Sequence, residues 1–222
     1  MNPKEIAGTR AAHFVKAGMT LGLGTGSTVY FTLMELGRMV RDGLIIQGVA
    51  TSDRTVDICE KEGIPLLDIH QVQKLDLYLD GADEVDPHYA LIKGGGGALF
   101  REKRVASLAK ERVIIVDESK IVPTLGTFPL PVEVVPFGWQ HVFSQIQSIG
   151  GNPVVRMVGE QFYHTDNGNY ILDCHFGAIP QPEALHHQLK AMIGLVETGL
   201  FFHMAERVVV GKSDGTVYVL PA

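Results

Sequence analysis

In the first half of the chain, short runs of apolar residues alternate with segments in which apolar residues recur at helical spacing. The run at 112–116 (RVIIV) holds almost only branched aliphatic residues, which is typical of strands buried on both faces. The predicted strands are 20–23, 44–50, 75–79 and 112–116, and the predicted helices are 10–17, 29–39, 54–62 and 98–110. This alternation predicts an α/β fold with a parallel sheet covered by helices on both faces.

The pattern changes after Pro129-Leu130-Pro131. Strands are predicted at 132–135, 154–158, 170–174 and 195–201, and helices at 139–149 and 183–193. The order β-α-β-β-α-β is that of a small two-layer α+β module of the ferredoxin-like kind. A last hairpin, 207–211 and 216–220, follows, and the pattern does not say which sheet it joins.

Composition excludes several classes of protein. With 45% hydrophobic residues and a net charge of -6, the chain is too apolar to be disordered, and it has no uninterrupted apolar stretch long enough to span a membrane. An acidic chain is also a poor nucleic-acid binder, because phosphate backbones require a basic surface. The N-terminus lacks an apolar signal core, and two cysteines without a CxxC pair allow one disulfide at most, so we expect a reduced, cytoplasmic protein.

Seven of the 25 glycines fall in two short clusters. The first, Gly22-Leu23-Gly24-Thr25-Gly26-Ser27-Thr28, joins a predicted strand to a predicted helix, where exposed N–H groups and the helix dipole attract an anion. A dinucleotide fingerprint would need glycine at position 27, and a Walker A loop would need a lysine. A phosphate pocket is therefore favoured, with a tight turn and a Ser/Thr helix cap as the alternative. Asp53 follows the second predicted strand, as the ribose-binding acid of an NAD site does, but a role as the cap of the next helix is favoured because the third glycine is missing.

The segment Asp80-Gly81-Ala82-Asp83-Glu84-Val85-Asp86 places four carboxylates directly after a buried strand. Its glycine comes too early for a calcium loop, and a magnesium site remains a weaker alternative. Because Asp80 is the first residue after the apolar strand, it is the best candidate for a carboxylate that points into a cleft.

The second cluster, Lys93-Gly94-Gly95-Gly96-Gly97, precedes the helix predicted from Ala98. Such a run favours a loop that cradles a ligand with its N–H groups over a disordered linker, and Lys93 can stabilise an oxyanion there. On the helix, Glu102 has no basic residue three or four positions away and falls on the apolar stripe. Desolvation would raise the pKa of a carboxyl group there unless a cation compensates, which suits a general base. Lys120 follows the end of another predicted strand. Its position fits a lysine of the binding site and an ordinary exposed loop lysine equally well.

Together these motifs resemble the type A ribose-5-phosphate isomerase family. The matching segments are GTGST (24–28), TSxxT (51–55), DGADE (80–84), KGGGGAL (93–99), REK (101–103), SK (119–120), FPLPVEV (128–134), TDNGN (165–169) and ETGLF (197–201). They cover nearly the whole chain. Glu206 departs from the family, which more often has aspartate before the last strands.

The resemblance implies a Rossmann-like catalytic domain, residues 1–129 and 205–222, with an inserted smaller domain, residues 130–204. It implies interconversion of ribose 5-phosphate and ribulose 5-phosphate in the pentose phosphate pathway through a cis-enediol(ate), without metal or organic cofactor. It further implies a homodimer or homotetramer.

The same resemblance assigns roles to individual residues. Glu102 would be the base, Asp80 and less certainly Asp83 would handle hydroxyl protons, and Lys93 would stabilise the enediolate. The substrate-binding residues would be Thr25, Gly26, Ser27, Thr28, Asp80, Gly81, Ala82, Asp83, Lys93, Gly94, Gly95, Gly96 and Lys120. Two other classes stay open: a related sugar-phosphate isomerase/deaminase, and a non-catalytic sugar-phosphate-binding domain.

Overall fold

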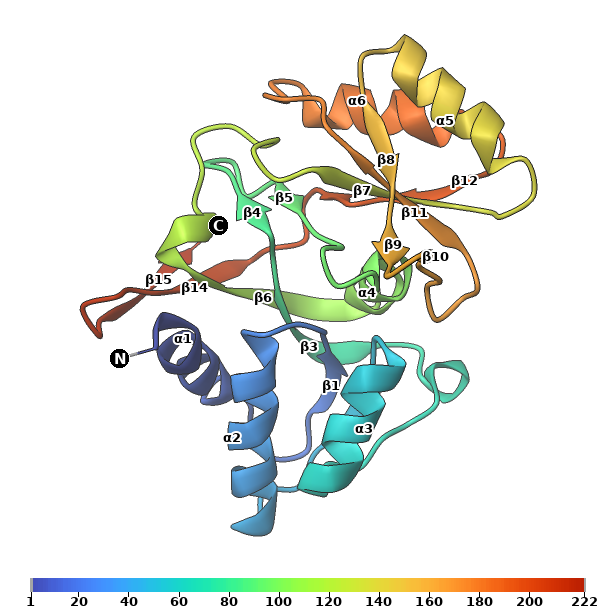
Figure 1. Ribbon diagram of the computed structural model, residues 1–222. Coiled ribbons are helices and arrows are strands. Elements are labelled where there is room, and N and C mark those ends of the chain that lie inside the picture. Colours follow the sequence, from blue (N-terminus) through green and yellow to red (C-terminus); the bar gives the residue numbers. More distant parts are fainter. Residues whose placement is uncertain (1, 222) are drawn as a thin grey trace. The chain divides into compact units, whose positions relative to one another are not determined.

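The structure, a computed structural model that describes residues 2–221, divides into two units (Figure 1). The first comprises the residues up to Ala82, Arg101–Ile121 and the residues from His203 onward. The second comprises Asp83–Phe100 and Val122–Phe202. Segments 83–100 and 122–129, which the sequence analysis gave to the larger domain, thus belong to the second unit, because 84–85 and 91–92 form a small sheet with 200–201.

A six-stranded sheet in the order β15-β14-β6-β3-β1-β2 forms the centre of the first unit. Its strands are β1 (Thr20–Leu23), β2 (Gln47–Ala50), β3 (Leu75–Gly81), β6 (Ala109–Asp117), β14 (Arg207–Gly211) and β15 (Val217–Pro221). All neighbouring pairs are parallel except β14 with β15. The predicted α/β fold class is confirmed, and the final hairpin joins this sheet beside β6.

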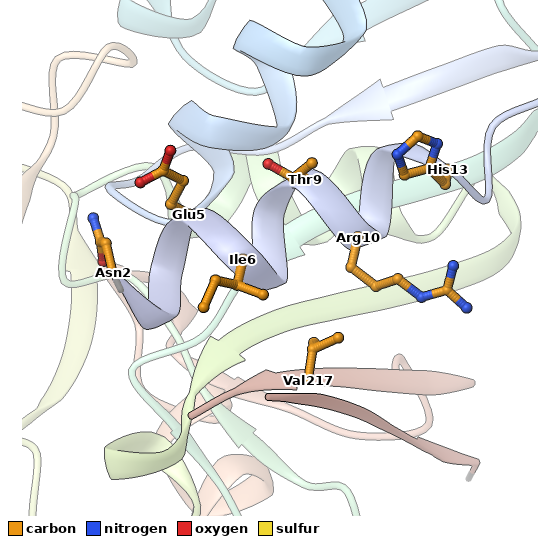
Figure 2. Close-up of a pocket in the computed structure, with 7 residues that line it drawn as sticks. All are labelled: Asn2, Glu5, Ile6, Thr9, Arg10, His13 and Val217. Carbon is orange, nitrogen blue, oxygen red and sulfur yellow. The ribbon is translucent and has the colours of Figure 1, made fainter. Parts of the chain in front are cut away.

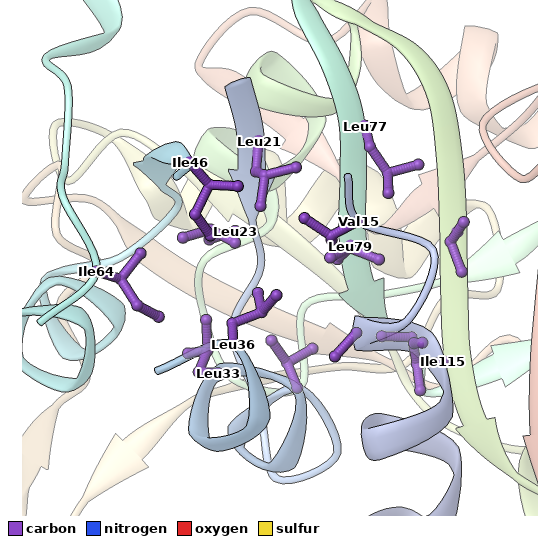
Figure 3. Packing of buried hydrophobic residues seen from close by; sticks show 14 of the residues in the cluster. Val15, Leu21, Leu23, Leu33, Leu36, Ile46, Ile64, Leu77, Leu79 and Ile115 are labelled. Carbon is purple, nitrogen blue, oxygen red and sulfur yellow. The ribbon is translucent and has the colours of Figure 1, made fainter. Parts of the chain in front are cut away.

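Three helices, α1 (Pro3–Ala12), α2 (Val29–Arg41) and α3 (Asp53–Glu62), pack on one face of this sheet (Figure 1). The cluster beneath them includes Leu21 and Leu23 of β1, Leu77 and Leu79 of β3, and Leu33 of α2 (Figure 3). Alternate residues of β3 point to the opposite face, where Tyr78 packs with Val105 of α4 (Leu99–Ala106). The two faces of β3 therefore differ: one is purely aliphatic, and the other carries a tyrosine.

The second unit contains a four-stranded antiparallel sheet in the order β12-β7-β11-β8. Its elements are β7 (Leu130–Val134), α5 (Trp139–Ser148), β8 (Pro153–Val155), β11 (Tyr170–Cys174), α6 (Pro182–Lys190) and β12 (Leu195–Thr198). The predicted β-α-β-β-α-β order is confirmed. A hairpin of β9 (Met157–Val158) and β10 (Gln161–Phe162), and a sheet of β4 (Glu84–Val85), β5 (Leu91–Ile92) and β13 (Leu200–Phe201), complete the unit.

Several element boundaries differ from the prediction. The first helix begins at Pro3, because Asn2 caps it by accepting a bond from Lys4 N, and it ends at Ala12 rather than at Ala17. Helix α4 ends at Ala106, before the predicted 110, because β6 has begun by Ala109. Helix α3 ends where predicted, with Gly63 in the left-handed conformation (φ 74°).

No helix within residues 2–221 is both long and apolar enough to cross a membrane. Cys59 and Cys174 are both free and buried. Burial raises the pKa of the Cys59 thiol to about 12, so this thiol stays protonated and packs as a small apolar side chain.

Candidate active site

The carboxyl ends of the parallel strands gather most of the predicted residues of the first unit at one edge of its sheet. Strand β1 leads into the loop 24–28, β3 ends with Asp80 and Gly81, and β6 leads into the short 3-10 turn Glu118–Lys120. Parallel strands expose their ligand-binding loops at this edge. The fold therefore places the segments that carry Thr25–Thr28, Asp80 and Lys120 along the same border of the unit.

Asp80 belongs to β3 itself and is fully buried. Its Oδ1 accepts hydrogen bonds from Thr25 N (3.0 Å) and Gly81 N (2.7 Å), and its Oδ2 accepts one from the Tyr78 hydroxyl. A Cβ at Gly24 would lie 2.1 Å from Asp80 Oδ1. Gly24 is thus required because the Asp80 carboxylate occupies the space that a side chain would fill.

Tyr78 is a site residue that the sequence analysis missed. Residues two apart in a strand share a face, so Tyr78 and Asp80 point the same way, and a Cβ at Gly22 would lie 2.7 Å from the Tyr78 ring. Burial raises the pKa of Tyr78 well above its usual range, and the nearby charges of Asp80 and Glu102 raise it further. Tyr78 therefore stays a neutral donor beside two carboxylates. The signal was available: Gly22 and Gly24 leave room on the same face as Tyr78 and Asp80.

Glu102 lies in the first turn of α4 and is 3% exposed. Its neighbour Arg101 points elsewhere and pairs with Asp53 (2.8 Å). The prediction that Glu102 falls on the buried stripe of the helix is confirmed. The prediction that Asp53 caps α3 is wrong, because Ser52 is the cap and accepts the bond from Thr55 N.

The hydroxyl of the half-buried Thr25 contacts a cluster of buried hydroxyl groups on Thr51, Ser52 and Thr55. Thr25 Oγ1 lies 2.9 Å from Thr51 Oγ1, 2.7 Å from Ser52 Oγ and 3.0 Å from Thr55 Oγ1. Thr55 Oγ1 also donates to the carbonyl of Gly24 (2.8 Å). The TSxxT motif therefore holds the end of β1, and the side chain of Thr25 serves this cluster.

The remainder of the first glycine loop surrounds the N-terminus of α2. Thr28 occupies the N-cap position but makes no side-chain cap hydrogen bond, so the predicted Ser/Thr cap is wrong for Thr28. Lys4 of α1 donates from Nζ to Ser27 Oγ (3.0 Å). The sequence analysis missed Lys4, because 23 residues and a strand separate it from Ser27. A positive side chain, a hydroxyl and the N-terminus of a 13-residue helix thus meet at this loop.

In the second unit, the acidic segment is tied to backbone N–H groups. Asp83 Oδ2 accepts from Gly95 N (2.8 Å), and a Cβ at Gly95 would lie 2.6 Å from Asp83 Oδ1. Glu84 accepts from Gly126 N and Phe128 N, both at 2.6 Å. Among residues 2–221, no group of three or more His, Cys, Asp or Glu side chains is arranged to hold a metal ion.

The second glycine loop is an ordered turn. Gly97 N donates to Gly94 O (2.9 Å), and both residues have positive φ (83° and 102°), which only glycine adopts readily. Lys93, directly before the turn, is 2% exposed, and its Nζ lies 5.5 Å from the centre of the Phe201 ring. The alternative of a disordered linker is therefore wrong, and the binding of a ligand by this loop stays a prediction.

A separate groove of about 500 Å³ runs along α1 (Figure 2). Its lining residues are Asn2, Glu5, Ile6, Thr9, Arg10, His13 and Val217. None of the residues predicted from the motifs lines this groove.

Comparison with known proteins identifies the group to which this chain is related. The family profile described as "Ribose 5-phosphate isomerase A (phosphoriboisomerase A)" matches residues 47–215. Ribose-5-phosphate isomerase A 1 of Oceanobacillus iheyensis is 52% identical over 217 residues, which is 97% of this chain and 96% of the relative.

Two solved structures agree with this result. The ribose 5-phosphate isomerase A of Methanocaldococcus jannaschii superposes with a TM-score of 0.93 at 38% identity, covering 99% of this chain and 98% of that chain. A D-ribose-5-phosphate isomerase in complex with phospho-erythronic acid gives 0.95 at 36% identity, with both chains fully covered.

The central sheet, parallel except at its β14–β15 edge, and the helices that cover it define an α/β protein. The chain belongs to the ribose-5-phosphate isomerase A family.

Proposed function

We propose that this chain interconverts ribose 5-phosphate and ribulose 5-phosphate, with Glu102 as the general base. The observation that carries the proposal is the Glu102 carboxylate, 3% exposed on α4 and close enough to Tyr78 to act on its pKa, as Asp80 does. Glu102 takes the proton from C2 of the open-chain aldose. The C2–H electron pair forms the C1=C2 bond while the C1=O π pair moves to O1, which gives the cis-enediolate. After a proton has moved from O2 to O1, the C1=C2 pair takes the proton from Glu102 at C1 as the C2=O bond of the ketose forms.

Asp80 is the proposed partner for the hydroxyl protons, with Asp83 in a lesser role. Ring opening needs a proton moved from the C1 hydroxyl to the ring oxygen, and the later steps move a proton between O1 and O2. The backbone N–H groups of Thr25 and Gly81 hold Asp80 Oδ1 in one orientation, which supports such a role.

Lys93 and the N–H groups of Gly94 and Gly96 would stabilise the negative charge of the enediolate, while the Gly95 N–H donates to Asp83. A buried ammonium group and preorganised N–H donors act strongly on developing charge, because they need no reorganisation when the charge forms. The phosphate would bind to Gly26–Thr28, where Lys4 contacts Ser27 and α2 begins. Lys120, on its turn after β6, is a further candidate for the phosphate end.

The ligand of the related solved structure supports this assignment. Phospho-erythronic acid is a phosphorylated four-carbon sugar acid, so it carries both a phosphate and a carboxylate. The planar, negatively charged carboxylate resembles the planar enediolate. We infer that this chain also binds that acid, in competition with its substrate.

The decisive experiment compares wild type with Glu102→Gln in an aldose–ketose assay with ribose 5-phosphate in the presence of EDTA. General-base catalysis contributes about 10²–10⁴-fold, so we expect the variant to lose at least about 10³-fold in kcat while wild type keeps full activity in EDTA. Glu60→Gln, at an exposed carboxylate of α3, is the matched control and should remain fully active.

Three results would reject the proposal. A fully active Glu102→Gln variant would remove the assigned base. Loss of wild-type activity in EDTA would replace the proposed chemistry by a metal-dependent one. Turnover of glucosamine 6-phosphate without activity on ribose 5-phosphate would favour a related isomerase/deaminase, and binding without turnover would favour a sugar-phosphate-binding domain.

We also propose that the chain forms a cytoplasmic homo-oligomer. Exposed apolar side chains on the second unit support association: Val154, Met157, Val158 and Phe162 are 39–64% exposed. Light scattering coupled to size exclusion should give the mass of a dimer or tetramer, and a monomeric mass would reject the oligomer.

A further inference from the structure

Arg156 lies against the second glycine loop from elsewhere in the second unit. It follows β8, and its Nη1 donates to the carbonyls of Gly94 (2.9 Å) and Gly95 (3.1 Å). The rest of the guanidinium is held by the Asp173 carboxylate, through Nε to Oδ2 at 2.9 Å and Nη2 to Oδ1 at 2.5 Å. One side chain, only 15% exposed, thus uses both edges of its planar group.

A second side chain contacts the same loop. The Tyr163 hydroxyl donates to the Gly96 carbonyl (3.4 Å), and the Arg156 guanidinium lies 5.7 Å from the centre of the Tyr163 ring. Three successive carbonyls, those of Gly94, Gly95 and Gly96, therefore receive hydrogen bonds from these two side chains.

Holding these carbonyls fixes the direction of the N–H groups. In a trans peptide, the C=O and the following N–H point in opposite directions. Because Arg156 binds Gly95 O, the N–H of Gly96 is directed away from Arg156. The positive guanidinium also polarises the peptide group, which makes its N–H a stronger donor.

We propose that Arg156 is a positioning residue of the isomerase reaction. It sets the orientation of the Gly96 N–H group, which stabilises the enediolate, through the carbonyl of Gly95 and without contacting substrate. Its bond to the Gly94 carbonyl fixes the next N–H, that of Gly95, which donates to Asp83. This inference rests on the proposed function. Arginine suits the position because only its rigid fork can engage a carboxylate on one edge and two carbonyls on the other, whereas lysine is a point charge.

The test is steady-state kinetics on wild type, Arg156→Met and Arg156→Lys with ribose 5-phosphate, together with thermal melting of each protein. Outright loss of an oxyanion donor costs about 10²–10³-fold in kcat. A misdirected donor should cost about 10- to 100-fold, because a displacement of about 1 Å has effects of that size. We expect this loss in kcat for Arg156→Met, with KM changed less than about 3-fold, and partial recovery in Arg156→Lys.

Two further variants keep the test decisive. Lys190→Met removes a cation of the same unit that binds the Val196 carbonyl (2.6 Å) and the Glu197 carboxylate, and it should keep the wild-type kcat. Asp173→Asn leaves Arg156 in place but loosens its carboxylate partner. It should lower kcat by a smaller factor than Arg156→Met does, and it serves as the main test if Arg156→Met does not fold.

The possible outcomes separate the two proposals. A wild type inactive on ribose 5-phosphate would overturn the proposed function. If wild type is active and Arg156→Met has an unchanged kcat, only the role of Arg156 is overturned. The same holds for an unchanged kcat in Asp173→Asn, where that variant is the main test. A lowered melting temperature with unchanged kcat per folded molecule would show that Arg156 is merely structural, and a raised KM alone would also refute its role at the reacting end.

Discussion

Replacing Tyr78 by phenylalanine removes one oxygen atom from the interior of the first unit. That oxygen donates to Asp80, which is fully buried, and the ring itself is 1% exposed. In Tyr78→Phe the ring keeps its packing against Val105, and Asp80 keeps the N–H groups of Thr25 and Gly81. The substitution therefore isolates one hydrogen bond to a charged group.

Because Tyr78→Phe removes a single hydrogen bond, the expected loss of stability is the contribution of that bond. A hydrogen bond to a charged group contributes about 1.5–3 kcal/mol, and its loss leaves a buried carboxylate with one donor fewer. For a chain of this size, 1 kcal/mol lowers the melting temperature by about 2–4 °C, so Tyr78→Phe should melt about 3–12 °C below wild type at pH 7.

Alkaline pH supplies a second, independent measurement. Burial and the charges of Asp80 and Glu102 hold the pKa of Tyr78 above its ordinary value of 10.0, so the folded state keeps its proton when the unfolded state has lost it. The stability due to this shift is present below pH 10.0 and is lost as the pH rises further. Wild type should therefore lose stability above pH 10.0 more steeply than Tyr78→Phe.

The assay is urea unfolding followed by circular dichroism at pH 7 and at several values above pH 10. Tyr170→Phe is the control, because that ring packs against Trp139 and Phe162 and its hydroxyl makes no hydrogen bond within residues 2–221. Equal stability of the two variants at pH 7, or equal slopes of wild type and Tyr78→Phe in base, would refute the reasoning.

Two further predictions concern the first unit. Gly24→Ala must displace the Asp80 carboxylate and should lower the free energy of unfolding in urea by about 1–3 kcal/mol, as core overpacking does. The Cβ of the control Gly81→Ala would meet nothing closer than 3.6 Å, so its free energy of unfolding should fall far less. Equal losses in the two variants would contradict the prediction. Burial opposes ionisation of Glu206, but its hydrogen bonds to Arg112 outweigh burial and hold its pKa below 4.5. The stabilisation by this ionised carboxylate is present above pH 4.5 and is lost as the pH falls through the lowered pKa. Glu206→Gln should therefore have a lower melting temperature than wild type at pH 7, and its melting temperature should fall less on acidification.

Much of the first unit could be predicted from sequence because its signals are local. The extent of β1 and the end of α3 at Gly63 follow from short-range hydrophobic patterns and one glycine cap. The burial of Glu102 follows from helical spacing alone. Strands β4 and β5 could not be predicted, because a two-residue strand has no periodicity: β5 forms by pairing with β13, and β4 forms by pairing with β5.

The missed site residues depend on contacts between segments distant in sequence. Lys4 reaches Ser27 across 23 residues, and Arg156 reaches Gly94 across 62. Tyr78 is different, since its alternation with Asp80 was visible in the sequence. The register of β1 beside β3 sets Gly22 opposite Tyr78. This pairing explains why β1 has a glycine where the Tyr78 ring needs space, and it is not visible in the sequence.

The hydroxyl cluster of Thr25, Thr51, Ser52 and Thr55 has a consequence for behaviour in salt. These four groups fix the end of β1 without any formal charge. Ionic strength weakens interactions between exposed charges, with a screening length of about 8 Å under physiological conditions, but it has little effect on hydrogen bonds between neutral groups. Added salt should therefore weaken the attraction between the loop and an anion while leaving the shape of the loop unchanged.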